Sequence, residues 1–256
     1  MTGPVVGRER RWWTWGAVAA WGALLTGAVF WSVRNDPPTV PEQRDIAEAL
    51  PALRAATGAV VEVAQDERWV LRLGELEVTE CAITPVRDGR EAGRNVTLYV
   101  AEGEAREALA GLAAGLPDGF GAGVAATRGG TRLSFFADAG DYIGVEATAH
   151  STDQVLTVRV FSGCRPDADD LDRSDPSAGA APAILTGAVT SQAVVCPGGG
   201  TAATFVGDQR VEVPEGIEPV WREPNGWAYR QGSESVVVTT DGDRARTTVT
   251  TGCRNG

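Results

Sequence analysis

The feature that most constrains this chain is an uncharged, apolar run near its N-terminus, from Trp12 to Val33. As a helix, a run of this length spans about 30 Å, the thickness of the hydrocarbon core of a bilayer. Tryptophans, which favour the membrane–water interface, lie near both ends of the run, at Trp12, Trp13, Trp15 and Trp31. The sequence therefore predicts a transmembrane helix over residues 12–33, with the lipid bilayer as its partner.

The charges beside the run predict its orientation. Arg8, Arg10 and Arg11 precede it, whereas only Arg34 follows it. Because positively charged flanks stay in the cytoplasm, we expect a cytoplasmic tail over residues 1–11 and the rest of the chain outside the plasma membrane. The alternative is a cleavable signal peptide, but the small residues that could form its cleavage site lie inside the apolar run instead of after it. An uncleaved signal-anchor of a single-pass protein is the preferred interpretation.

Small residues recur at every fourth position of the run, at Ala19, Ala23 and Gly27. This spacing lets two transmembrane helices approach closely, so it would permit a homo-oligomer through this face. Alanine-rich filler is the preferred explanation, because the motif is common in membrane helices.

Four cysteines follow the anchor, at Cys81, Cys164, Cys196 and Cys253. Extracytoplasmic compartments are oxidising, and none of the four stands in a C-x-x-C pair. Disulfides are therefore favoured over zinc or redox chemistry. Four cysteines allow three pairings.

An internal repeat favours one of these pairings. Leu116–Phe120 matches Val213–Ile217 in chemical type, and Val155–Arg165 ends in the same Gly-Cys-Arg as Arg244–Arg254. Each copy runs from a cysteine through a Pro-acid-Gly turn, a glycine hairpin and two strands to a second cysteine. We therefore predict one disulfide in each repeat, Cys81–Cys164 and Cys196–Cys253.

Hydrophobic periodicity predicts an α+β fold in two domains with mainly antiparallel sheets. The first domain combines helices over about 42–57, ended by Gly58, and 103–114 with eight strand-like runs. The second domain has six strand-like runs and is nearly all β. The expected divisions are a Pro-rich stalk over 34–41, the α+β domain over 42–164, an acidic flexible linker over 165–183 and the β-rich domain over 184–256.

Composition excludes some classes of function. With a net charge of -11, the chain lacks the basic surface that nucleic acids require. His150 is the only histidine, so the sequence does not favour metal sites with several histidine ligands or Ser-His-Asp triads. The aspartates of the linker lack the spacing of a calcium-binding loop. We therefore expect no catalytic, cofactor-binding or metal-binding residues.

The hairpin over residues 220–230 is a candidate binding surface. It carries Trp221, Arg222, Trp227 and Tyr229, and a two-residue turn at Asn225-Gly226 would place the arginine opposite the tyrosine. An arginine beside aromatic rings can form a cation–π pair or a platform for sugar or peptide. Packing in the core of a small domain is the preferred alternative.

These observations favour a non-catalytic envelope protein that binds an unknown extracytoplasmic protein or ligand. The alternative is an enzyme that acts on cell-wall glycan through carboxylates such as Glu146 or Asp141. That enzyme would need two carboxylates at a suitable separation in a deep cleft. In overall layout the chain resembles the single-pass envelope proteins of actinobacteria.

Overall fold

A computed structural model describes residues 8–35, 44–127, 129–242 and 244–254. Helix α1 (Arg8–Asn35) contains one stretch, Trp15–Ser32, that is long and apolar enough to cross a membrane. It belongs to a unit of residues 1–43, and residues 44–256 form a second compact unit. Most of the predicted tail and stalk, residues 1–7 and 36–41, lies outside the described residues.

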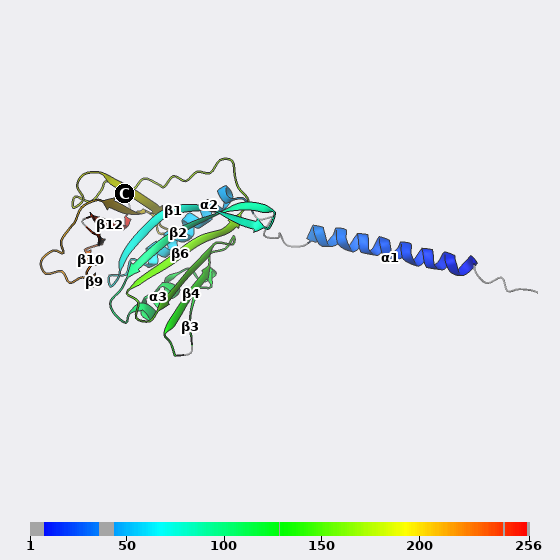
Figure 1. Ribbon diagram of the computed structural model, residues 1–256, viewed down its shortest axis with the longest axis horizontal. Helices are drawn as coiled ribbons and strands as arrows, with labels where there is room; N and C mark the ends of the chain where they lie inside the picture. The colour runs from blue at the N-terminus through cyan, green and yellow to red at the C-terminus, as the bar shows by residue number, and fades with distance from the viewer. Residues whose placement is uncertain (1–7, 36–43, 128, 243, 255–256) are drawn as a thin grey trace, which may run out of the picture. The chain divides into compact units, whose positions relative to one another are not determined.

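The second unit holds two antiparallel sheets of six strands each (Figure 1), which confirms the α+β class. Sheet A has the order β1-β2-β6-β5-β4-β3, and sheet B has the order β7-β8-β12-β11-β10-β9. The strands of sheet A are β1 (Val70–Thr84), β2 (Arg87–Tyr99), β3 (Gly123–Ala126), β4 (Arg132–Asp138), β5 (Gly144–His150) and β6 (Val155–Arg165). Those of sheet B are β7 (Val189–Val195), β8 (Thr201–Gly207), β9 (Trp221–Glu223), β10 (Gly226–Gln231), β11 (Glu234–Asp241) and β12 (Arg244–Arg254).

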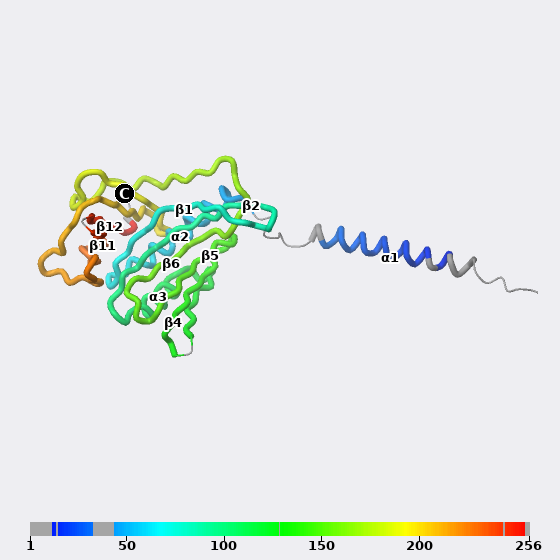
Figure 2. Tube along the Cα trace, viewed as in Figure 1, coloured from blue at the N-terminus to red at the C-terminus, as the bar shows by residue number. Residues whose placement is uncertain are grey.

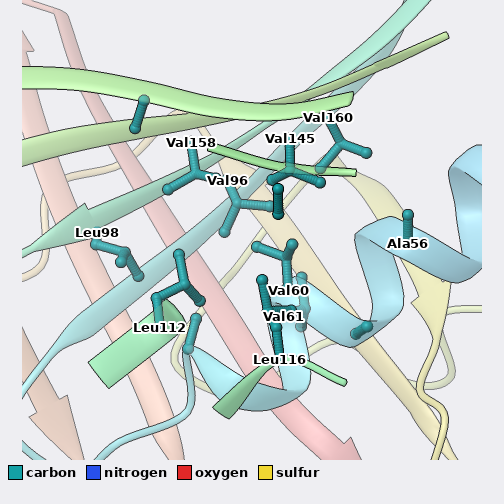
Figure 3. Packing of buried hydrophobic residues seen from close by; sticks show 14 of the residues in the cluster. Ala56, Val60, Val61, Val96, Leu98, Leu112, Leu116, Val145, Val158 and Val160 are labelled. Atoms are coloured by element: carbon teal, nitrogen blue, oxygen red, sulfur yellow. The ribbon is translucent and has the colours of Figure 1, made fainter. Parts of the chain in front are cut away.

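Two helices, α2 (Ile46–Val63) and α3 (Ala105–Gly115), cover one face of sheet A. Asp45 caps α2, since its carboxylate accepts a hydrogen bond from the Glu48 N–H at 2.9 Å. In Figure 3, valines of α2 lie beside apolar side chains of the strands and Leu112 of α3. The predicted end of this helix at Gly58 is wrong. The helix continues to Val63, and its last turns bury Val60 and Val61 in the core. Gly58 stands within it because this position lies directly against the Val195 carbonyl of β7, where only glycine fits.

The opposite face of sheet A, called here its outer face, carries neither α2 nor α3. Along β4, buried and exposed residues alternate, with Leu133, Phe135 and Ala137 packed on the helix side. A strand places successive side chains on opposite faces, so this alternation leaves the outer face in solvent.

The two sheets meet where β1, an edge strand of sheet A, lies against sheet B. The N–H groups of Leu71 and Leu73 donate to the hydroxyls of Ser235 at 3.0 Å and Thr204 at 3.1 Å. These bonds satisfy backbone groups that an edge strand would otherwise expose. Close by, Tyr99 and Trp221 pack with their ring centroids 5.1 Å apart.

A buried ion pair joins the two sheets at a second place. Arg94 of β2 donates to both carboxylate oxygens of Asp175, at 3.1 and 2.6 Å. The pair also bonds to the backbone of Ala193 in β7. The Ala193 N–H donates to Asp175 at 2.8 Å, and the Ala193 carbonyl accepts from Arg94 at 3.1 Å. Arg94 also donates to the Gly74 carbonyl at 2.8 Å. The ion pair thus occupies the place of a neighbouring strand at this edge of β7.

Asp175 belongs to the segment that leads from β6 to β7, which Figure 2 shows as an extended yellow-green trace. The segment has no helix or strand, yet it is held at further points. Arg90 pairs with Asp167 at 3.0 Å, and Arg54 donates to the carbonyls of Asp172 and Ser174, each at 2.8 Å.

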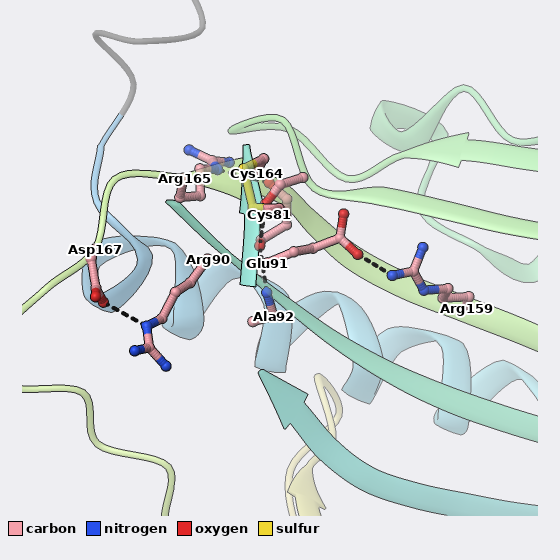
Figure 4. The surroundings of a disulfide bond; sticks show 10 residues. Cys81, Arg90, Glu91, Ala92, Arg159, Cys164, Arg165 and Asp167 are labelled. Carbon is pink, nitrogen blue, oxygen red and sulfur yellow. Dashed lines mark hydrogen bonds and ion pairs between the residues drawn. A yellow bond between two sulfur atoms is a disulfide. The ribbon is translucent and has the colours of Figure 1, made fainter. Parts of the chain in front are cut away.

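Both predicted disulfides are present. Cys81–Cys164 joins β1 to β6 (Figure 4), and Cys196–Cys253 joins the turn after β7 to β12. The predicted division into two separate domains is not confirmed, because the large core contains residues of both halves. Val194 and Ala202 of sheet B pack into the same cluster as the helices of sheet A.

Candidate functional site

A polar cavity of about 620 Å³ lies between sheet A and sheet B and is called here the inter-sheet groove. The side chains that line the groove come from paired positions on neighbouring strands. Arg72 of β1 lies opposite Thr97 of β2, and Thr248 of β12 lies opposite Val206 of β8. The polar lining residues are Arg72, Glu75, Glu77, Asn95 and Thr97 from sheet A, and Thr190, Gln192, Thr204, Asp208, Arg246 and Thr248 from the second half of the chain.

Several of these side chains have no partner among the described residues. The buried or half-buried side chains of Arg72, Asn95, Thr97 and Thr248 form no hydrogen bond or ion pair there, and neither do the exposed Glu77 and Thr190. Their polar atoms are also not sealed from solvent. Buried and half-buried polar groups normally find partners, so this group is free to bind a ligand that enters the groove.

Apart from Glu77 and Thr190, the other polar lining residues are engaged within the protein. The Thr204 hydroxyl accepts from Leu73 and shares a hydrogen bond of 2.7 Å with Thr250. Gln192 donates to Glu75 at 3.3 Å, and Arg246 lies 3.8 Å from Asp208. These contacts fix the walls of the groove, whereas the unpartnered side chains remain available.

Arg72 supplies the main unpaired positive charge of the groove. Its effect is visible at Tyr99: burial raises the pKa of the Tyr99 phenol, and the nearby positive charge of Arg72 opposes that rise. A guanidinium without a carboxylate partner can bind an anionic or hydroxyl-bearing group. Among the described residues, no group of three or more His, Cys, Asp or Glu side chains could hold a metal ion.

Two further cavities lie nearby. One, also of about 620 Å³, shares Asp208 and Arg246 with the groove and extends it along β11 and β12. The other, of about 560 Å³, is mainly apolar and lies between α2, β7 and the segment around Asp175. Since Val195 and Pro197 line it with few polar groups, it offers little to orient a polar ligand.

The structure places the residues of the predicted hairpin surface as follows. Trp221, Trp227 and Tyr229 are 6%, 8% and 0% exposed, and Arg222 is exposed. Trp221 lies on the opposite face of sheet B from the other two rings. The cation beside Trp227 is Arg210, whose guanidinium carbon lies 4.7 Å from the ring centroid.

The predicted register of this hairpin is wrong. Arg222 lies opposite Trp227, not Tyr229, because the two-residue loop is Pro224-Asn225. An Asn-Gly turn of type I′ needs a positive φ at Asn225, which this residue does not adopt. Proline favours the first central position of a type I turn, and it moves the loop one residue towards the N-terminus.

The carboxylates of the enzymatic alternative lie at the edges and surface of sheet A. Glu146 is on the outer face, 3.9 Å from Arg159. Asp141 is in the β4–β5 turn with a positive φ of 49°, and its carbonyl accepts a hydrogen bond from Arg165. The backbone N–H of His150, at the end of β5, donates to the Asp153 carboxylate at 2.7 Å. The cavities described above are lined by other residues.

The aspartates around the predicted linker interact with neighbouring side chains. A hydrogen bond from Arg90 holds the pKa of Asp167 below its usual value, and hydrogen bonds from Ser174 do the same for Asp172. These two carboxylates therefore have partners within the protein.

Comparison with known proteins adds one distant likeness. No protein-family model matches the chain, and no curated protein matches it by sequence. A crystal structure of a DUF4853 family protein from Actinomyces odontolyticus is 17% identical, over 63% of this chain and 93% of its own, with a TM-score of 0.36. At that TM-score, we take neither fold nor function from this similarity.

Proposed function

We propose that the chain is a single-pass membrane protein whose extracytoplasmic part binds a polar ligand in the inter-sheet groove without catalysing a reaction. The observation that carries this proposal is the convergence of four unpartnered side chains, Arg72, Asn95, Thr97 and Thr248, on one cavity. They come from both sheets, so a bound ligand would contact both halves of the chain. Interfaces between such units are frequent sites of ligand binding.

The proposed location rests on the anchor and the cysteines. The apolar stretch within α1 and the arginines before it favour a cytoplasmic N-terminus. Two disulfides support an oxidising compartment for the remainder. Alkaline phosphatase fused after Gly256 should be active, because it folds only outside the cytoplasm. A fluorescent C-terminal fusion that folds only in the cytoplasm is the matched control, and bright fluorescence with inactive phosphatase would contradict this topology.

We also propose that the two sheets are copies of one unit. Their strand orders are the same when the second set is renumbered, and each half has one disulfide between its first strand region and its last strand. The second copy has loops where the first has α2 and α3. On this view the groove lies between equivalent outer faces of the two copies.

Ligand binding is tested with the full chain in lipid nanodiscs. Amino acids, sugars, sugar acids and organic phosphates are added separately, and thermal unfolding is measured. At a concentration of 100 times Kd, a ligand stabilises by about 2.7 kcal/mol, which is a measurable rise in Tm. The rise should disappear in Arg72→Ala and persist in Arg222→Ala, which removes an exposed arginine outside the groove. If no class of compound stabilises the protein, or if both variants respond alike, the groove is not the binding site.

A further inference from the structure

The outer face of sheet A carries a row of hydroxyl side chains that starts in the inter-sheet groove. Thr97 of β2 lies opposite Thr157 of β6, and Ser134 of β4 lies opposite Thr148 of β5. β5 and β6 pair from Gly144 with Phe161 to Glu146 with Arg159, and Thr148 and Thr157 lie two residues beyond this last pair. These four residues, called here the hydroxyl row, come from four strands that are neighbours in sheet A (Figure 1).

Three of the four residues of the row are open to solvent. Ser134, Thr148 and Thr157 are exposed, Thr97 is 4% exposed, and none of the four forms a side-chain hydrogen bond with another described residue. Thr97 lines the groove and faces Arg72 across the strand pair. The row and the groove are thus one continuous polar surface.

A second row of side chains runs parallel to the first. Asn95 lies opposite Arg159, which pairs in register with Glu146. Figure 4 shows Arg159 bonded to Glu91, and its guanidinium carbon also lies 5.0 Å from the centroid of the Phe161 ring. Arg159 is therefore held in place before any ligand arrives, which lowers the entropic cost of binding.

Phe136 ends the second row and offers an open aromatic face. It lies opposite Glu146 and is 55% exposed. Its ring covers Gly123 of β3, where an added Cβ would lie 3.1 Å from the ring. The tip of the ring therefore lies on β3, and the exposed part of the ring is free to contact a ligand.

This arrangement suits one kind of occupant. Neighbouring strands are about 4.8 Å apart, which is close to the repeat of one sugar unit in an extended polysaccharide. Hydroxyl and amide groups match the many hydroxyls of such a chain, and the apolar side of a sugar ring stacks on an aromatic face. A protein partner would instead need a buried apolar centre, and the exposed side chains of β4, β5 and β6 on this face are mostly polar.

We propose that the hydroxyl row and Phe136 bind an extended polysaccharide, one sugar unit per strand, whose end enters the inter-sheet groove at Arg72. The proposal rests on the function proposed above and names the class of ligand. Binding should require several consecutive units, because the contacts are spread over four strands.

The test uses the full chain in nanodiscs, since glycoside detergents would compete for the site. Binding of cellohexaose and chitohexaose, both extended β-1,4-linked chains, is measured by isothermal titration calorimetry, with cellobiose as a length control. Maltohexaose, which coils, is the control for shape. We expect at least one extended hexaose to bind and neither control to do so. In Thr148→Val/Thr157→Val, binding should weaken about tenfold, as expected for the loss of two hydrogen bonds.

Matched variants distinguish loss of the polysaccharide site from loss of the fold and from loss of ligand binding in the groove. Thr79→Val, an exposed threonine elsewhere on β1, should bind like the wild type. Phe136→Ala should weaken binding, whereas cooperative thermal unfolding of each variant checks that it is folded. Binding that depends on Arg72 but is insensitive to the double variant and to Phe136→Ala would overturn the polysaccharide site and leave the groove function intact. Absence of binding by both extended hexaoses would also overturn it, whatever other ligand the groove takes.

Discussion

The phenolic oxygen of Tyr229 is buried and has no hydrogen-bond partner among the described residues. An unsatisfied buried hydroxyl costs about 1–3 kcal/mol. Tyr229→Phe removes the hydroxyl and keeps the ring, so we expect the free energy of unfolding to rise by about 1 kcal/mol. Chemical denaturation of the full chain measures this, with Tyr142→Phe as the control at an exposed position. A clear loss of stability in Tyr229→Phe would mean that the hydroxyl has a partner, such as a bound water.

The same residue predicts a response to alkaline pH. Burial raises the pKa of Tyr229 in the folded protein. In the unfolded chain the phenol ionises near its ordinary pKa of about 10. The unfolded state therefore loses its proton first, and the free energy of unfolding falls as pH rises from about 10 through the folded pKa. The fall should be smaller in Tyr229→Phe, although Tyr99, whose pKa burial also raises, retains part of it.

Arg94 is the residue through which three parts of the chain contact one another. Its side chain is 1% exposed and that of Asp175 is 19% exposed. Removing one member of a buried pair leaves the other charge without compensation, so Asp175→Ala should lower the free energy of unfolding by about 3 kcal/mol. The matched control is Asp208→Ala, from an exposed pair of 3.8 Å, with an expected change below about 0.5 kcal/mol. Equal effects of the two variants in denaturant unfolding would contradict a structural role for the buried pair.

At the scale of elements, strands with alternating burial were predictable, because alternation leaves a clear mark in the sequence, but six strands form in the first half where eight runs were predicted. The run over 132–138 is an example, since each second residue is apolar and buried. The hairpin register at Pro224 and the continuation of α2 past Gly58 were not predictable in this way. The first depends on which of two competing turns forms, and the second on a contact with β7, far away in the sequence.

Gly58 also gives a test in which two physical effects have opposite signs. In an isolated helix, Gly→Ala stabilises by about 1 kcal/mol. Here an added Cβ would overlap the backbone carbonyl of Val195, which cannot move without displacing β7. We therefore expect Gly58→Ala to destabilise the protein by about 2 kcal/mol, the cost of overpacking a core. Gly119→Ala, with nothing within 4 Å of the added Cβ, should stay within about 0.5 kcal/mol in the same unfolding experiment. Stabilisation by Gly58→Ala would show that α2 and β7 are less closely packed.

At the scale of the whole molecule, the apolar N-terminal helix and the disulfides could be predicted, and the groove could not. An apolar run and the order of the cysteines can both be read directly along the sequence. The groove depends on how β1 of sheet A lies on sheet B, which brings Arg72 beside Thr248. Composition also predicts that the acidic segment is flexible. It cannot show that Asp175, within this segment, has a buried partner in Arg94.

The contacts between the halves lead to a prediction about folding. If residues 42–164 were an independent domain, they would unfold cooperatively by themselves. In the structure, Leu71 and Leu73 bond to hydroxyls of sheet B, and Val194 and Ala202 fill part of the core beneath α2. Without the second half, these backbone groups and apolar surfaces would be exposed. We therefore expect residues 44–165, with the Cys81–Cys164 disulfide formed, to unfold at a lower Tm and less cooperatively than residues 44–256. Calorimetry on the two fragments measures this, and a cooperative transition of the shorter fragment at the Tm of the longer one would instead support two separate domains.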